Sequence, residues 1–246
     1  MPAPGAGCAE LHTRGAKLGS ARLFPSGRRM IRLLLPVLLL IAPATAATQG
    51  RPAAADAAKA VQQKYDQVKD FTADFSHTYE GGVLKKKTVE HGTVQIKKPG
   101  RMRWEYTTPD KKTFVSDGHK IYSWVPADKQ VIVSSVPPDD EATTAVLFLA
   151  GKGNLSRDFN VTYADGGSAE TWTLKLDPKQ KQRDYDWLIV GVDPNTMQIR
   201  TLTAADQQGG RSTFAFSNYR ENTGLADSVF TFKIPRGADV INAGSR

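Results

Sequence analysis

Cysteine is almost absent from this chain of 246 residues, which contains only Cys8. A single thiol excludes an intrachain disulfide framework, a cysteine-based zinc site and an iron–sulfur cluster. Histidine is also scarce, and its four positions show no spacing typical of metal ligands: His12, His77, His91 and His119. We therefore expect neither a bound metal nor a cofactor.

Sequence motifs of catalysis are missing as well. The chain contains no Gly-x-Ser-x-Gly, no His-Glu-x-x-His, and no Walker or Rossmann pattern. The run Asp139-Asp140-Glu141 admits a metal cluster. We favour the start of a helix there, because acidic residues complement the helix dipole. No catalytic residue can be assigned, and we expect the protein not to be an enzyme.

No apolar run is long enough to cross a membrane. Residues 33–41 form an apolar run of nine residues, whereas a membrane-spanning helix needs about 20. Basic residues precede this run and Ala44-Thr45-Ala46 follows it, an order typical of a secretory signal peptide. We expect cleavage after Ala46, with Met30 as an alternative start of the chain. Residues 1–46 are then an extension with its signal, and residues 47–246 form one domain.

Cleavage would change the charge of the protein. Residues 1–46 hold six basic residues and one acidic residue, so five of the eight net positive charges leave with them. The remaining charge of +3 gives little support to nucleic-acid binding. Cys8 would leave too, and it precedes the apolar run, so it cannot anchor a lipid behind it. We therefore expect a soluble protein in the periplasm of a Gram-negative bacterium, with no nucleic-acid partner.

The exported part begins with a helical pattern and continues with strand patterns. Residues 53–70 are rich in helix formers, with one apolar stripe at Ala57, Val61, Tyr65 and Val68. The period then changes to two over residues 71–79. Turn signals separate further expected strands at 87–98, 101–107, 112–116, 119–125, 129–135, 158–163, 170–176, 185–192, 197–205, 211–219 and 229–234. Eleven or twelve strands with short turns predict an antiparallel meander.

Two other segments have open interpretations. Residues 142–150 are nearly all apolar and are followed by glycines, which predicts a short helix that something must cover. Aromatic residues occur on nearly every strand, either as an ordinary core or as the wall of an apolar cavity under that helix. Lys85-Lys86-Lys87 admits contact with phosphate, but we favour a solvated hairpin edge that discourages aggregation.

A family resemblance rests on several motifs in order. They are residues 92–106 with the core Lys98-Pro99-Gly100-Arg101-Met102-Arg103-Trp104, then Val115-Ser116-Asp117-Gly118, Ile121-Tyr122-Ser123-Trp124 and residues 230–240. This series resembles the periplasmic outer-membrane lipoprotein carrier family, LolA, over about residues 55–241. The resemblance implies a mainly β fold with helices. The sheet would be an unclosed, curved antiparallel half-barrel of about 11 strands, with an α-helical lid over an apolar cavity.

The resemblance also implies partners. Members of the family accept acylated lipoproteins from an inner-membrane ABC-type release complex and pass them to LolB, a receptor at the outer membrane. We expect the same partners here, and a monomer. Alternatives are a general phospholipid or glycolipid carrier of the same fold, and a periplasmic sensor of lipoproteins, although such sensors carry a further C-terminal domain and this chain ends at Arg246. A secreted lipase is disfavoured, because no nucleophile elbow occurs.

Site residues follow from the same resemblance. Lys98 stands where the family has an arginine that closes the empty cavity, so we expect a weaker latch there. Lys97 is an alternative, although strand alternation turns it to the opposite face. We expect Met102 to touch acyl chains and Trp104 to form the cavity wall. The full set of expected acyl-chain contacts is Phe71, Phe75, Met102, Trp104, Tyr106, Phe114, Val146, Phe148, Leu149, Phe214 and Phe216.

Overall fold

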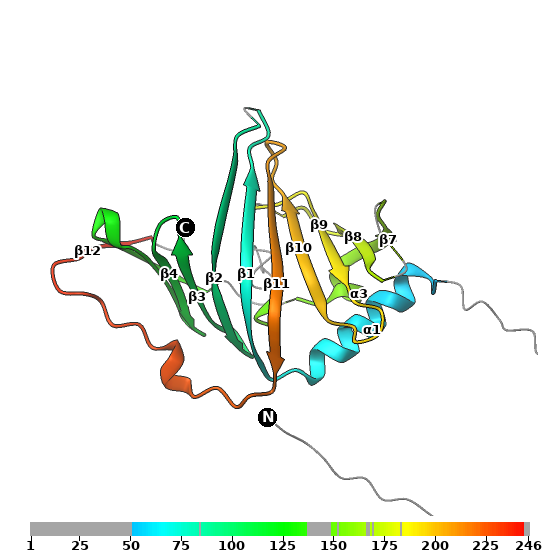
Figure 1. Ribbon diagram of the computed structural model, residues 1–246, viewed down its shortest axis with the longest axis horizontal. Coiled ribbons are helices and arrows are strands. Elements are labelled where there is room, and N and C mark those ends of the chain that lie inside the picture. Colours follow the sequence, from blue (N-terminus) through cyan, green and yellow to red (C-terminus); the bar gives the residue numbers. More distant parts are fainter. Residues whose placement is uncertain are drawn as a thin grey trace, which may run out of the picture. The chain divides into compact units, whose positions relative to one another are not determined.

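A sheet of twelve strands dominates the computed structural model of the chain (Figure 1). The structure describes residues 51–83, 85–136, 149–151, 153–165, 168, 170–182 and 184–243. These residues belong to one compact unit, Gln49–Arg246. The strands are β1 (Asp70–Glu80), β2 (Lys87–Lys97), β3 (Arg101–Thr108), β4 (Lys112–Asp117), β5 (Lys120–Val125), β6 (Gln130–Ser135), β7 (Phe159–Tyr163), β8 (Trp172–Pro178), β9 (Trp187–Val192), β10 (Ile199–Ala205), β11 (Arg211–Glu221) and β12 (Asp239–Asn242).

The sheet is curved and does not close into a barrel. Its order is β12-β6-β5-β4-β3-β2-β1-β11-β10-β9-β8-β7, with β12 and β7 at the two ends. Strand β1 pairs with its sequence neighbour β2 on one side and with β11 on the other, which joins the two halves of the chain. All pairs are antiparallel except β12 with β6, which is parallel. The predicted unclosed antiparallel sheet is thus confirmed, with one parallel exception.

Strand alternation divides the sheet into two faces. In β1, Phe71, Ala73 and Phe75 are buried, whereas the residues between them are only partly buried. In β3, Met102, Trp104 and Tyr106 are buried in the same way. We call the face that carries these residues the inner face. Because the period of a strand is two, the sequence pattern alone places each of these side chains.

The N-terminal helix covers one part of the core. Helix α1 spans Ala54–Gln67 and buries Ala57, Ala58, Val61 and Tyr65, which confirms the predicted stripe. It packs against β7 and the short helix α3 (Leu155–Asp158), as Figure 1 shows. The predicted helix ended at residue 70, but α1 ends earlier because Asp70 already pairs with Lys97 of β2. Apolar burial, not intrinsic propensity, holds such a helix in place.

A glycine in β2 lets the inner face pack tightly. A Cβ atom on Gly92 would lie 2.0 Å from the Glu105 carbonyl oxygen and 2.8 Å from the Phe75 ring. The β2–β3 register also shifts between His91 and Gly92. A bulge with glycine allows this close approach of the backbones. The Phe75 ring therefore reaches β3 across the space that a side chain on β2 would fill.

The C-terminal segment corrects one prediction. We expected a strand at 229–234, but a 3₁₀ helix, η3, occupies Asp227–Phe230 and the last strand is β12. Phe230 and Phe232 alternate like the residues of a strand, but each is fixed by its own packing contact. Phe230 is buried, near the η3 contacts with β3 and β4, and Phe232 stacks on Tyr122 at 5.4 Å. The segment is held by these side chains and not by a ladder of hydrogen bonds.

The helix predicted at 142–150 lies mostly outside the described residues. Its last part is described, and Leu149 and Ala150 are fully covered.

Candidate functional site: the aromatic inner face

The inner face carries a continuous cluster of aromatic rings. Phe75 lies at its centre, with ring centroids 5.1 Å from Trp104, 4.9 Å from Tyr106 and 6.0 Å from Phe214. Trp104 in turn contacts Phe214 at 5.1 Å and Phe216 at 6.2 Å. Most of these pairs are edge-to-face or tilted, the arrangement that ring quadrupoles favour. Strands β1, β3 and β11 supply this surface because they lie close together near the centre of the sheet, in the order β3-β2-β1-β11.

The structure brings together nine of the eleven residues expected to contact acyl chains. Tyr106 and Phe114 are 5.6 Å apart, which extends the aromatic cluster onto β4. Phe71, Met102 and Leu149 belong to the same apolar core. Val146 and Phe148 lie outside the described residues. The grouping is a fact of the fold, and the contact of these side chains with a ligand stays a prediction.

One polar atom within this surface has no partner. Trp104 is 3% exposed, and its indole Nε1 has no hydrogen-bond partner. A buried donor without an acceptor costs about 1–3 kcal/mol. The Trp104 indole is therefore an unused hydrogen-bond donor within the aromatic cluster. A bound ligand that placed an acceptor within reach of Nε1 would remove this desolvation penalty.

Lys98 links the turn between β2 and β3 to helix α1. Its ammonium group donates to the backbone carbonyl of Tyr65 and lies 3.4 Å from the centre of the Tyr65 ring. Carbonyls in the last turn of a helix attract cations, because they carry the negative end of the dipole. Burial lowers the pKa of Lys98 to about 8, with Asp66 and Glu221 opposing the shift.

The same turn contacts residues 149–151 directly. The Tyr65 hydroxyl donates to the Leu149 carbonyl, and the Gly100 amide donates to the Ala150 carbonyl at 2.9 Å. A Cβ on Gly151 would lie 3.0 Å from the Lys98 side chain, so the two are already in close contact. The turn, α1 and residues 149–151 therefore meet at Lys98 and Tyr65.

Lys97 faces away from this contact. Its ammonium group donates to the Leu225 carbonyl at 2.7 Å and to Asp227 at 2.6 Å. Both partners belong to the C-terminal segment. Lys97 therefore ties that segment to β2, and it lies on the face opposite Lys98, as strand alternation indicated.

A polar group that the sequence analysis did not identify borders the aromatic cluster. His77 continues the inner-face alternation of β1 and stacks on Phe214 at 4.2 Å. Its Nδ1 lies 3.1 Å from Glu90, and its Nε2 lies 2.7 Å from the Ser212 hydroxyl. Lys112 donates to Glu90 at 2.5 Å. Burial lowers the pKa of His77, while Glu90 opposes the shift and Lys112 adds to it. Only the alternation Phe71-Ala73-Phe75-His77 signalled this position in advance.

Among the described residues, no three His, Cys, Asp or Glu side chains are grouped so that they could hold a metal ion. Within that same part of the chain, no helix is both long and apolar enough to span a bilayer.

Comparison with known proteins assigns the family. Residues 66–233 match the family described as "Outer membrane lipoprotein carrier protein LolA". The outer-membrane lipoprotein carrier protein of Pseudomonas fluorescens is 30% identical over 87% of this chain and 98% of its own length. That of Chromohalobacter salexigens is 32% identical over 73% of this chain and 83% of its own.

Among solved structures, a LolA superfamily protein from Nitrosomonas europaea aligns with a TM-score of 0.40 and 12% identity, over 74% of this chain and 99% of that one. Such a distant likeness adds nothing to the sequence matches. Those matches cover most of the chain, including all strands of the aromatic inner face. The chain belongs to the LolA family of outer-membrane lipoprotein carrier proteins.

Proposed function

We propose that this protein carries acylated lipoproteins through the periplasm to the outer membrane. The observation that supports this most is the aromatic inner face of a chain that belongs to the LolA family. Strands β1, β3, β4 and β11 form this face with Phe75, Trp104, Tyr106, Phe114, Phe214 and Phe216. A wide apolar surface on an open sheet suits hydrocarbon chains. The role is binding and release, and it needs no bond to be made or broken.

The energy of acyl transfer explains why a carrier is needed. Each methylene that leaves a bilayer for water costs about 0.8 kcal/mol, so a chain of roughly sixteen carbons costs on the order of 10 kcal/mol. A lipoprotein with two or three such chains would not leave a membrane unaided at a useful rate. A protein surface that replaces the bilayer removes most of this cost. Cargo release then requires that the surface does not bind too tightly.

We propose Lys98 as the latch of the empty protein. It holds α1 through the Tyr65 carbonyl, and Tyr65 holds Leu149, so one side chain stabilises the contact among three segments. Opening of the inner face to cargo would break this contact. Its stabilisation of the empty state subtracts from net cargo affinity, which favours later release.

The finer partners are part of the proposal. An inner-membrane ABC-type release complex would supply the cargo, and a receptor of the LolB type would accept it. Removal of residues 1–46 on export would leave the periplasmic form, residues 47–246.

The experiment is a titration of residues 47–246 with a synthetic triacylated lipopeptide. A diacyl phospholipid at the same concentrations is the comparison, with tryptophan fluorescence as the signal because Trp104 lies in the aromatic cluster. We expect preferential binding of the lipopeptide. Equal binding of both would instead assign a general lipid carrier. Binding of neither would leave the aromatic residues as an ordinary core and contradict the proposal.

A further inference from the structure

Exposed apolar side chains gather in two places among the described residues. The large hydrophobic residues with the greatest exposure are Tyr79, Val83, Val89, Ile132, Ile234, Val240 and Ile241. Ile132, Val240 and Ile241 are on β6 and β12, at one edge of the sheet, and Ile234 precedes β12 in the chain. The other three belong to the β1–β2 hairpin, where Val83 is 86% exposed. Val83 is thus far more exposed than any other apolar side chain in this set.

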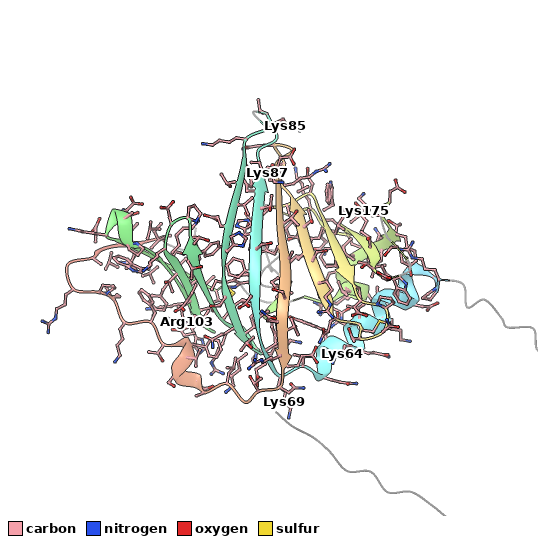
Figure 2. All side chains as sticks on the ribbon, in the orientation of Figure 1. Lys64, Lys69, Lys85, Lys87, Arg103 and Lys175 are labelled. Carbon is pink, nitrogen blue, oxygen red and sulfur yellow. The ribbon has the colours of Figure 1, made fainter. Side chains whose placement is uncertain are left out.

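Three consecutive lysines occupy the same hairpin. Lys85, Lys86 and Lys87 are all exposed, and none takes part in an ion pair among the described residues. Lys85 and Lys87 lie at the end of the hairpin, whereas Lys64 and Lys69 lie at the opposite end of β1 (Figure 2). Cationic and apolar side chains are therefore combined at one end of the molecule's central strands.

The hairpin projects beyond its neighbours. Strand β2 pairs with β3 from Lys97 as far as His91, so residues 87–90 have no partner on that side. On the other side, the turn at 206–210 packs against it, since a Cβ on Gly82 would lie 2.0 Å from the Gln208 carbonyl. Backbone bonds between Gly81 and Lys86 and between Lys85 and Gly81 define the turn itself. Figure 1 shows this end extending past the other strands. The hairpin therefore projects from the sheet and is held in place by its own turn and by the turn at 206–210.

We propose that this hairpin tip, formed by Val83, Lys85, Lys86 and Lys87, docks on the surface of an anionic phospholipid bilayer. Lysines near such a surface are attracted to its phosphate groups, and a small apolar side chain beside them can enter the interface. Tyr79 and Val89 stand behind the tip, and an amphipathic tyrosine suits the headgroup region. A charged edge that only discourages aggregation would not need an apolar residue fully exposed at its tip.

The contact would be weak and reversible. Three lysines and one valine give far less affinity than a lipid anchor or an inserted helix. It would be sensitive to salt, because the Debye length falls from about 30 Å at 0.01 M to about 3 Å at 1 M. Brief contact of this kind suits a protein that must reach a membrane and leave it again. The docking itself does not rest on the proposed cargo.

The test measures co-sedimentation of residues 47–246 with phospholipid vesicles at low ionic strength. One vesicle type is phosphatidylcholine alone and the other contains about one third phosphatidylglycerol. We expect the wild type to bind only the anionic vesicles. Replacement of Lys85, Lys86 and Lys87 by glutamate lowers the partition coefficient by at least about 100-fold, since each basic residue contributes about a factor of five and glutamate adds repulsion.

Matched variants separate the hairpin tip from general charge. Glutamate at Lys111, Lys120 and Lys129 makes the same change of net charge at exposed sites elsewhere, and Lys129 shares the positive φ of Lys85. We expect binding to fall only a few-fold in that variant. Val83→Asp lowers binding about tenfold, and the control Ile234→Asp, also at an exposed apolar residue, does not.

Several outcomes would overturn the proposal. Equal losses of vesicle binding in both triple-lysine variants would do so, and so would equal binding of the wild type to both vesicle types. No binding by the wild type to either vesicle type would do so too, and would favour an acidic protein as the partner of the lysines. Failure of the carrier proposal is a separate result. It appears in the lipopeptide titration without vesicles, in which the hairpin variants should keep the wild-type affinity.

Discussion

At the scale of single residues, His77 shows how neighbours change a side chain's chemistry. It lies between the apolar ring of Phe214 and three polar groups, namely Glu90, Ser212 and the more distant Tyr106 hydroxyl at 3.5 Å. Burial disfavours the charged imidazolium, and Lys112 beside Glu90 adds to this effect. The pKa of His77 is therefore lower in the folded protein than in the unfolded chain, where it is about 6.5.

This shift predicts a loss of stability in mild acid. Below pH 6.5 the unfolded chain binds a proton that folded His77 does not, so the free energy of unfolding falls as the pH falls. The slope is at most about 1.4 kcal/mol per pH unit for this one group. In His77→Gln this part of the pH dependence disappears. Urea unfolding of both proteins between pH 5 and 7.5 measures it.

The control is His119→Gln at an exposed position between β4 and β5. That variant should keep the part of the pH dependence that belongs to His77. Parallel curves for the wild type and His77→Gln would contradict the prediction.

At the scale of elements, the turn between β2 and β3 decides how the helical parts attach to the sheet. From the sequence, Lys98 is expected to act as a latch that closes the empty cavity. In the structure its acceptor is the Tyr65 carbonyl on α1, and residues 149–151 are reached through Tyr65, Gly100 and packing against Gly151. The position of Lys98 was predictable from the family motif. Its hydrogen-bond acceptor was not, because α1 lies more than thirty residues earlier in the chain.

The latch predicts that Lys98→Leu binds the lipopeptide more tightly and releases it more slowly. Loss of a charged hydrogen bond worth about 1.5–3 kcal/mol removes part of the cost of opening, so affinity rises by about tenfold or more. Lys98→Arg should behave as wild type or bind slightly less tightly. Fluorescence titrations and dilution-induced release measure both quantities.

Lys97→Leu is the matched control, because among the described residues that side chain bonds only the C-terminal segment. Its affinity should stay at the wild-type value. Because the pKa of Lys98 is about 8, the difference between wild type and Lys98→Leu should narrow from pH 7 to pH 9. Equal affinities for Lys98→Leu and wild type at pH 7 would show that Lys98 is not a latch.

At the scale of the whole molecule, one open sheet must keep an apolar face from water while it remains accessible to a ligand. The cluster of Phe75, Trp104 and Phe214 is at most 8% exposed. Helix α1 packs against β7 over another part of the same core, and Lys98 joins α1 and residues 149–151 to the turn between β2 and β3. The charges that make the chain basic lie mostly in residues 1–46, so residues 47–246 carry a modest +3.

The export signal predicts that protein isolated from the periplasm begins at Ala47. Signal cleavage requires small side chains at Ala44 and Ala46, whereas the residue between them can be larger. Intact-mass spectrometry should therefore find residues 47–246 in the wild type and in Thr45→Leu. In Ala46→Leu we expect the uncleaved precursor. A periplasmic protein that retains residues before Ala47 would contradict the assignment of residues 1–46.

The sequence by itself determined what depends on neighbouring residues. Alternation placed Met102, Trp104 and Tyr106 on one face of β3, and the apolar stripe of α1 was readable because both periods are local properties of the backbone. The same rule turned Lys97 away from Lys98. Strand alternation also failed locally, since Phe230 and Phe232 repeat like a strand but are anchored by packing.

Tertiary structure alone decided which distant segments meet. The pairing of β1 with β11 brings Phe75 beside Phe214 and His77 beside Ser212, and the parallel addition of β12 to β6 covers an edge strand. Neither strand pairing can be recognised from neighbouring residues in the sequence. The free energy that stabilises each pairing comes from burying surfaces that are far apart in the chain. For the same reason the acceptor of Lys98 and the lowered pKa of His77 exist only in the folded molecule.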